Sequence, residues 1–142
     1  MKKKVFIFDL EGTLSFSNWR ESWIPDYESF EALFRYDPCN EWIAEIARRA
    51  WDDGHIVVIL TGKMVRGRQD VTDWLKRHNI GYTWLHMRSN DDKRPSEIYK
   101  MDYVRKFQTS EVAMFFDDRK KIIDHVSSFG YKTYHVKGGQ ND

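Results

Sequence analysis

The chain of 142 residues has little cysteine, little proline and no long apolar run. Its single cysteine, Cys39, excludes an internal disulfide, which is typical of a reducing compartment, so we expect a cytoplasmic protein. No stretch approaches the roughly 18 uninterrupted apolar residues of a membrane-spanning helix, so we expect no membrane contact. Lysines 2–4 lead directly into the first apolar run, without the longer apolar core and cleavage site of a signal peptide.

The sequence also lacks an excess of either positive or negative charge, and it has no closely paired histidines. The 23 Lys and Arg residues nearly cancel the 22 Asp and Glu residues, and the formal net charge of +1 gives no general case for a nucleic-acid coat or a membrane-surface protein. The five histidines are scattered, unlike those of a zinc site. The length suits one domain with a substantial core, so we expect residues 1–142 to form a single domain.

Five short apolar runs alternate with helical patterns along the chain. Strand-like runs cover residues 5–8, 56–60, 82–86, 112–116 and 131–136. Helical patterns follow Asn40 as a plausible N-cap, surround residues 71–75, begin near Pro95, and end at Gly130. This alternation predicts a three-layer, Rossmann-like α/β fold with a central parallel five-stranded sheet and helices on both faces.

Residues 15–39 break the alternation. They contain no clear strand but are rich in aromatic residues, and a short helix from Pro25 to about Arg35 is plausible. We interpret this segment as a small cap or flap inserted into the domain. Its role stays open among plain packing over the sheet edge, a lid, and a platform on which bases stack.

Reactive side chains follow three of the strand-like runs. Right-handed crossovers place the carboxyl ends of parallel strands at one edge of a sheet, so these side chains should converge. The residues are Asp9 and Glu11 after the first run, Thr61, Gly62 and Lys63 after the second, and Asp117 and Asp118 after the fourth.

The chemistry of this convergence indicates phosphoryl transfer. Clustered carboxylates repel one another unless a cation intervenes, and oxygen ligands without His or Cys suit Mg²⁺. A hydroxyl, a glycine amide and a lysine are anion-binding groups. The i, i+2 spacing of Asp9 and Glu11 favours a nucleophile and a proton carrier. An anion site beside a metal site and a carboxylate nucleophile predicts an enzyme of phosphoryl transfer.

These motifs resemble those of the haloacid dehalogenase (HAD) superfamily of phosphatases. Its motifs are Asp-x-Asp-Gly-Thr, a Thr or Ser after an apolar strand, a Lys, and an acidic pair. In this sequence, their counterparts are residues 9–13, Thr61, Lys100 and the pair at 117–118. The resemblance implies that Asp9 forms an aspartyl-phosphate, that Glu11 carries the proton, and that Lys100 offsets negative charge. It also implies Mg²⁺ held by Asp9, the main-chain carbonyl of Glu11, Asp117 and Asp118.

The second half is more closely similar to the 3′-phosphatase domain of bacteriophage-type polynucleotide kinase-phosphatases. The resemblance is carried by residues 87–88, 92–94, 98–100 and 116–119. No Gly-x-x-x-x-Gly-Lys-Ser/Thr loop is present, so we expect the phosphatase domain without that family's kinase half. We expect substrate phosphates to meet Gly62, Lys63, Arg66, Arg88 and Arg94.

Glu11 is a departure, because the second acid of the first motif is usually Asp. The extra methylene moves the carboxyl group by about 1.5 Å, which matters for a proton transfer that needs a reach of about 2.6–3.2 Å. Enolase-phosphatases of the same superfamily resemble this chain in carrying Asp-x-Glu-Gly-Thr, so the change does not imply inactivity.

Three hypotheses about function follow. The first is a phosphatase for nucleic-acid 3′ ends or phosphorylated nucleotides, with the neutral net charge favouring a terminal nucleotide over a long footprint. The second is a phosphatase for a small metabolite or a 5′-nucleotide. The third is a non-catalytic phosphate-binding or interaction module. The sequence identifies no partner protein.

Overall fold

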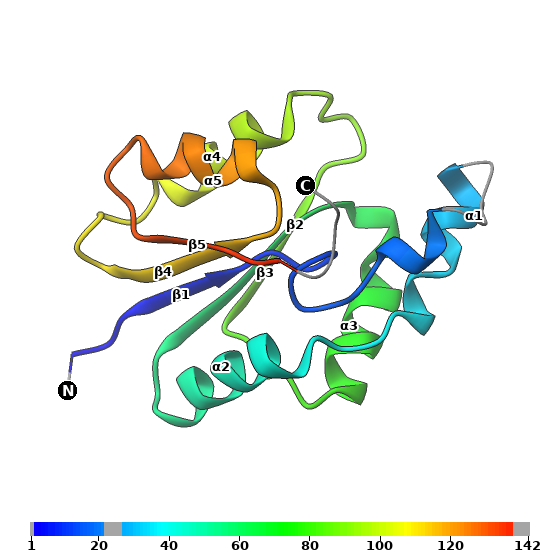
Figure 1. Ribbon diagram of the computed structural model, residues 1–142, viewed down its shortest axis with the longest axis horizontal. Helices are drawn as coiled ribbons and strands as arrows, with labels where there is room; N and C mark the ends of the chain where they lie inside the picture. The colour runs from blue at the N-terminus through cyan, green and yellow to red at the C-terminus, as the bar shows by residue number, and fades with distance from the viewer. Residues whose placement is uncertain (1, 22–26, 138–142) are drawn as a thin grey trace.

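The central sheet of the computed structural model, which describes residues 2–21 and 27–137, contains five parallel strands in the order β3-β2-β1-β4-β5 (Figure 1). This confirms the predicted parallel α/β architecture. The sequence runs outward in both directions from β1, so the sheet has its topological switch point between β1 and β4. The strands are β1 Val5–Phe8, β2 Ile56–Met64, β3 Trp84–Arg88, β4 Val112–Asp117 and β5 Thr133–His135.

Helices cover both faces of the sheet (Figure 1). Helices α2 and α3 pack their apolar residues on one face, while α4 and α5 pack on the other, so that each face has its own buried cluster. The four helices are α2 Glu41–Asp52, α3 Arg68–Arg77, α4 Ser96–Val104 and α5 Lys120–Ser127. Burial of these apolar faces is the main stabilising contribution to the three layers.

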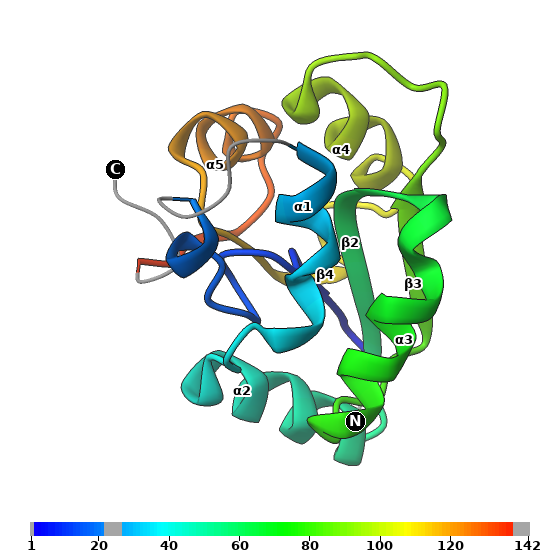
Figure 2. The same ribbon diagram turned by 90° about the vertical axis from the view of Figure 1, so that its right-hand side faces the viewer.

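Residues 15–21 and 27–39 lie beyond the carboxyl end of the sheet (Figure 1). They contain α1 Tyr27–Ala32 and two 3-10 helices, η1 Asn18–Arg20 and η2 Phe34–Tyr36. Viewed from that end, α1 lies in front of the strands (Figure 2). The predicted helix was longer: its expected start at Pro25 lies outside the described residues, and α1 ends at Ala32.

The register of the sheet sets the two carboxylates of the first and fourth strands side by side. Phe8 of β1 pairs with Phe116 of β4, and the next residues along the two strands are Asp9 and Asp117. The pairing shifts by one residue at the far end, because Val5 pairs with Val112 whereas Phe6 pairs with Met114. This irregularity leaves Ala113 as an extra residue of β4.

Two local predictions need correction. Strand β2 does not end at Leu60; it continues to Met64, so Thr61, Gly62 and Lys63 belong to the strand rather than to a following turn. Asn40 has the predicted N-cap position of α2 but makes no side-chain cap. Its side-chain amide instead donates to the carbonyl of Thr13, 3.1 Å away.

None of the helices within residues 2–21 and 27–137 is both long and apolar enough to cross a bilayer.

Candidate active site

Asp9 lies at the carboxyl end of β1, where one hydrogen bond fixes its main chain and two fix its carboxylate. Its main-chain N–H donates to the carbonyl of Phe116 on β4 at 2.9 Å. Lys100 Nζ donates to Asp9 Oδ1 at 2.8 Å, and the hydroxyl of Thr13 donates to Oδ2 at 2.9 Å. The side chain is 6% exposed, so this carboxylate is held in one orientation at the floor of a hollow.

Lys100 reaches the same point from α4. It is 3% exposed and also donates to Asp117 Oδ2 at 2.6 Å. Burial alone would lower the pKa of Lys100, but the neighbouring Asp117 and Asp9 raise it above its usual value. The lysine is therefore charged and compensates two carboxylates at once.

Asp118 supplies a third carboxylate that no described cation pairs with. Ligand oxygens of Asp9, Asp117 and Asp118 lie within 4.8 Å of one another. Asp118 Oδ2 is buried and has no hydrogen-bond partner among the described residues. Burial and the negative charges of Asp9 and Asp117 raise the pKa of Asp118 to about 9. We call these three aspartates with Lys100 the aspartate cluster.

The aspartate cluster fits a divalent metal ion. Its acids outnumber its single lysine, its metal-binding atoms would be carboxylate oxygens, and one of these oxygens is buried without a hydrogen-bond partner among the described residues. Hard oxygen ligands of this kind suit Mg²⁺. Asp9, Asp117 and Asp118 could therefore hold the ion, as the sequence predicted.

Gly12 makes room for the third carboxylate. Its φ of +87° lies in the left-handed region that glycine adopts readily. A Cβ at this position would collide with the carboxylate of Asp118. The glycine of the first motif therefore serves both the turn and the packing of the loop over Asp118.

Glu11 points into a second buried group of charges, which the sequence did not reveal. Arg20 Nη2 donates to Glu11 Oε2 at 2.8 Å and to Asp37 Oδ2 at 2.6 Å, while Arg20 Nε donates to Asp37 Oδ1 at 2.8 Å. Asp37 also accepts from Ser15 and Trp19, at 3.0 and 2.8 Å. Arg20 and Asp37 are 0% and 2% exposed. We call Glu11, Arg20 and Asp37 the arginine cluster.

The arginine cluster restrains the longer side chain of Glu11. Lys63 Nζ lies 3.8 Å from Oε1 of Glu11, whereas Arg20 contacts the other carboxylate oxygen, Oε2. Burial raises the pKa of Glu11, and Lys63 and Arg20 oppose that rise. The carboxyl group of Glu11 is thus held near Asp9, in buried surroundings that favour its protonated form.

The end of β2 forms one wall of the hollow. Lys63 is 3% exposed, forms an ion pair with Glu31 of α1, and lies 4.7 Å above the ring of Phe34. The main-chain N–H of Lys63 donates to the hydroxyl of Thr61 at 3.0 Å. A Cβ at Gly62 would meet no atom within 4 Å, so the backbone there faces open space.

Arg88 at the end of β3 pairs with Met64 at the end of β2 and lines the same hollow. Its guanidinium lies 4.6 Å from the ring centroid of Tyr99, whose hydroxyl donates to the carbonyl of Thr61 at 2.9 Å. The other guanidinium nitrogens bond to Arg94's carbonyl and to Ser96, while Nε is buried without a partner among the described residues. Arg88 therefore retains a donor without a partner in the part of the chain that the structure describes.

A hollow of about 330 Å³ unites most of the predicted site residues. Among them are the aspartate cluster, Glu11, Thr61, Gly62, Lys63 and Arg88. Residues that sequence reasoning missed also line it, namely Ser17, Glu21, Phe30, Glu31, Met64, Ser96, Arg119 and Ile122. Arg119 directly follows the acidic pair, which could have identified it. The others lie in segments without a motif.

Arg66 and Arg94 do not line this hollow. Arg66 lies in an adjoining hollow of about 320 Å³, which shares Glu31, Lys63 and Met64 with the first. Arg94 is exposed and pairs with Asp92 and Asp102 at 2.8 and 3.3 Å. The predicted role of Arg94 in substrate binding therefore has no support from its position.

Comparisons with solved structures find the same arrangement elsewhere. A chain of the Pnkp1/Rnl/Hen1 complex is 28% identical with a TM-score of 0.80, and the match covers 97% of this chain and 47% of that one. A chain of the Pnkp1/Rnl/Hen1 RNA repair complex is 26% identical with a TM-score of 0.80, covering 94% and 42%. The present chain thus spans about half the length of these relatives.

More distant structures share the fold. A D,D-heptose 1,7-bisphosphate phosphatase from B. bronchiseptica, complexed with magnesium and phosphate, is 15% identical with a TM-score of 0.64, covering 96% of this chain and 82% of that one. A HAD family enzyme from Bacteroides thetaiotaomicron, complexed with magnesium and inorganic phosphate, is 12% identical with a TM-score of 0.61, covering 99% and 97%.

The sequence comparisons give the family. No curated protein sequence matches the chain. The family model of the polynucleotide kinase PNKP phosphatase domain matches residues 3–141, almost the entire chain. The match, the parallel sheet and the structural relatives agree with the sequence motifs. The chain belongs to the PNKP phosphatase domain family of the HAD superfamily and is a HAD phosphatase.

Proposed function

We propose that this phosphatase is Mg²⁺-dependent, works through an aspartyl-phosphate on Asp9, and removes phosphate from nucleic-acid 3′ ends or from nucleotides. The single observation that carries the proposal is the setting of Asp9. Its carboxylate is fixed between Lys100 and Thr13, beside two further carboxylates of which one has an unpartnered, buried oxygen. A carboxylate so placed is suited to attack a phosphorus atom.

The chemistry then divides between the two acids. One oxygen of Asp9 forms the bond to phosphorus while the bond to the leaving alkoxide breaks. Glu11 gives its proton to that alkoxide, and afterwards takes a proton from the water that hydrolyses the aspartyl-phosphate. Contacts from Arg20 and Lys63 support this role, because they hold the longer glutamate in one place.

The remaining residues of the hollow would hold the phosphoryl group. The Thr61 hydroxyl, the Gly62 amide and Lys63 would contact its oxygens, while Lys100 offsets the charge of Asp9. Bound Mg²⁺, held by Asp9, Asp117, Asp118 and the Glu11 carbonyl, would supply the positive charge that lets two anions approach. The open space beside Gly62 is consistent with a phosphate at this point.

Family membership supports a nucleic-acid or nucleotide substrate. The family is that of a polynucleotide kinase phosphatase domain, and one relative belongs to an RNA repair complex with Rnl and Hen1. Arg88 lines the hollow and retains a buried donor, which could meet a phosphate next to the scissile one. A similar repair-enzyme partner is a reasonable candidate for this chain as well. The single cysteine continues to favour the cytoplasm.

The charges of the hollow favour a short substrate footprint. Carboxylates outnumber cations among the lining residues, with Glu21 and Glu31 facing the same space as Lys63 and Arg88. A long phosphate backbone would meet more repulsion here than a terminal nucleotide, because it carries more negative charges. We also propose that residues 15–39 act as a small cap within a single domain, because four residues of this segment line the hollow, namely Ser17, Glu21, Phe30 and Glu31. The same observation favours the second candidate function, a phosphatase for a small phosphorylated metabolite.

A substrate screen tests these alternatives. The chain is assayed with Mg²⁺ and with EDTA against a 3′-phosphorylated oligonucleotide, 3′- and 5′-nucleotides, a sugar phosphate and an aryl phosphate. We expect the highest kcat/KM for a 3′-phosphorylated nucleotide or oligonucleotide, and no turnover in EDTA. A preference for the sugar phosphate, or equal rates on the aryl phosphate, would contradict the nucleic-acid proposal.

The variant Asp9→Asn tests the nucleophile. It should lower kcat by at least about 10⁴-fold and remove the acid-stable phosphoryl label on the protein after quenching. Asp53→Asn serves as the matched control, because Asp53 is exposed at the end of α2. If neither the wild type nor the Asp9→Asn variant showed phosphatase activity, the result would support the non-catalytic module instead.

A further inference from the structure

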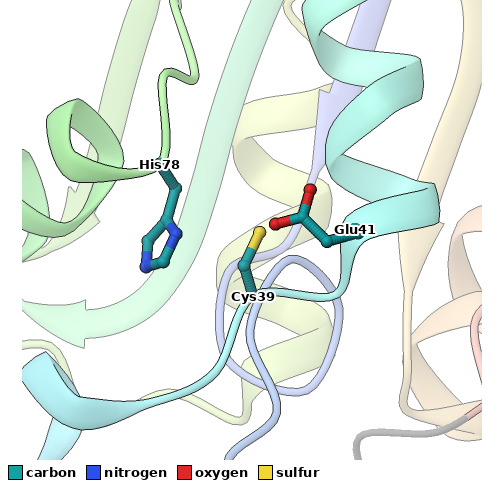
Figure 3. A group of neighbouring side chains, drawn as sticks. All are labelled: Cys39, Glu41 and His78. Carbon is teal, nitrogen blue, oxygen red and sulfur yellow. The ribbon is translucent and has the colours of Figure 1, made fainter.

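A cysteine, a glutamate and a histidine meet at a point outside the hollow. Cys39 ends the segment 15–39, Glu41 begins α2, and His78 follows the last residue of α3. One ligand atom from each lies within 4.8 Å of the other two. Figure 3 shows the thiol of Cys39 between the carboxylate of Glu41 and the ring of His78. Three different ligand types thus converge from three segments.

We infer that Cys39, Glu41 and His78 form a second metal site, which takes a borderline divalent cation of the Zn²⁺ class. Sulfur, imidazole nitrogen and a carboxylate are the three donor types that Zn²⁺ binds in proteins. Mg²⁺ prefers oxygen donors and does not favour this set. The site is therefore chemically distinct from the aspartate cluster, where every side-chain donor is a carboxylate oxygen.

Arg48 organises two of the three ligands from behind. Its Nη1 donates to Glu41 Oε2 at 3.0 Å, while its Nε and Nη2 donate to the main-chain carbonyl of His78 at 3.2 and 2.7 Å. One arginine therefore holds the glutamate side chain and the histidine backbone together, and the other oxygen of Glu41 remains for a metal ion. Metal-binding carboxylates are commonly oriented by such a hydrogen bond.

The ring of His78 is positioned by packing, and one of its nitrogens makes no hydrogen bond to the described residues. It packs 4.4 Å from the ring of Trp74, and its Nε2 is buried with no partner among the described residues. A ring nitrogen of this kind is a common ligand of divalent metal ions.

The proton on Cys39 is the one that a metal ion must displace. Burial and the hydrogen-bonded carboxylate of Glu41 raise the pKa of the thiol to about 12, whereas the bond from Arg48 lowers the pKa of Glu41. Binding would release the thiol proton to solvent, leaving one thiolate and one carboxylate to neutralise the dication. Glu41 is exposed, so an ion can enter and water can complete a fourth coordination position.

The position of the site gives it a structural consequence. Cys39 forms an antiparallel bridge with Ser15, and the N–H of Phe16 donates to the carbonyl of Pro38 at 2.9 Å, so the two ends of the segment 15–39 meet here. A metal ion would join this junction to α2 and α3. Binding should therefore stabilise the fold without taking part in catalysis.

Cobalt binding tests the inference with a spectroscopic readout. The full chain, kept reduced, is titrated with Co²⁺ in the Asp118→Asn background, which weakens the aspartate cluster as a competing site. We expect one equivalent to bind with a thiolate-to-cobalt charge-transfer band, and Zn²⁺ to remove that band by displacement. Zn²⁺ should also raise the Tm.

Single substitutions then identify the ligands. Cys39→Ser should abolish the band, and His78→Asn or Glu41→Gln should weaken Zn²⁺ binding by about 10-fold or more. Glu45→Gln is the matched control for Glu41→Gln, since Glu45 is an exposed acid on α2 that also contacts Arg48, at 3.4 Å. His78→Asn keeps the thiol, so it tests the site even if Cys39→Ser fails to fold. Absence of the band, or Zn²⁺ affinity unchanged by these substitutions, would overturn the inference.

Discussion

The aspartate cluster and the arginine cluster both contain buried charged side chains, and they share the first motif, which supplies Asp9 to one and Glu11 to the other. Only in the arginine cluster is every charged side chain paired with another of the cluster. In the arginine cluster, the guanidinium of Arg20 pairs with both Glu11 and Asp37, and Asp37 accepts two further hydrogen bonds. In the aspartate cluster, a single lysine faces three carboxylates, and one oxygen of Asp118 has no partner in the described structure.

This difference in charge pairing distinguishes a cluster that stabilises the fold from one that can bind a ligand. A buried charge with complete hydrogen bonding holds segments together, and removing one partner is costly. A buried charge without compensation destabilises the protein until a ligand supplies the missing charge. The arginine cluster thus fixes the segment 15–39 and Glu11, whereas the aspartate cluster is ready for a cation. The same chemical change, Asp to Asn, should therefore have opposite effects in the two clusters.

The largest effect is expected for Asp37→Asn. The substitution leaves the buried charge of Arg20 with only Glu11 as an ionic partner, so the free energy of unfolding should fall by about 3 kcal/mol. Urea unfolding followed by circular dichroism measures the change, with the exposed Asp53→Asn as control. A loss below about 0.5 kcal/mol, the usual range for surface substitutions, would remove the distinction between the clusters.

Asp118→Asn should act in the opposite direction in the absence of metal. The pKa of Asp118 is raised from 3.8 to about 9 on folding, so the folded state binds this proton more tightly and stability falls as pH rises through that interval. In EDTA at pH 7, the variant should therefore be more stable than the wild type by at least about 1.4 kcal/mol, the equivalent of one pKa unit.

Unfolding curves at pH 5 and pH 8, with EDTA or with Mg²⁺, check this expectation. The wild type should lose stability between the two pH values in EDTA, and the variant should lose less. Mg²⁺ should stabilise the wild type more than the variant. If the variant were less stable than the wild type in EDTA, the view of Asp118 as a carboxyl group whose ionisation is not compensated within the protein would be wrong.

The smallest effect is expected for Glu31→Gln, which tests whether Lys63 belongs to either cluster. When Glu31 is neutralised, Lys63 still has Glu11 as an ionic partner, and the side chain of Glu31 is 23% exposed. The free energy of unfolding should therefore change by less than about 1 kcal/mol. Lys63 would then be freer for a phosphate, and KM should fall while kcat stays within about twofold. Steady-state kinetics beside urea unfolding give both values. A large loss of stability would place Lys63 among the structural contacts.

The sequence predicted the framework and the aspartate cluster well because both depend on simple rules. Alternating apolar runs predict a parallel sheet, and crossovers of one hand bring Asp9, Thr61 and Asp117 to one edge. Lys100 was found only by resemblance to a family motif, since a lysine on a helix is otherwise common. The end of β2 was misjudged, because polar residues within a strand look like the turn that follows it.

The arginine cluster could not be predicted, because nothing in its spacing indicates contact. Arg20 and Asp37 lie 17 positions apart in a segment without a regular pattern, and Glu11 belongs to a different part of the chain. Their pairing depends on how the segment folds back over the sheet edge. The pairing of Arg94 with Asp92 and Asp102 could not be predicted for the same reason.

The extra residue of β4 has a consequence for how the enzyme tolerates changes in chain length. Register is regained between Phe6 and Met114, well before the strands reach Asp9 and Asp117. A one-residue shift that persisted would turn Asp117 to the other face of the sheet. Insertions or deletions near Ala113 can thus be absorbed at the amino end of the strand, whereas the same change beyond Met114 would separate the two carboxylates. The tolerance of β4 to length changes should therefore differ sharply between its two ends.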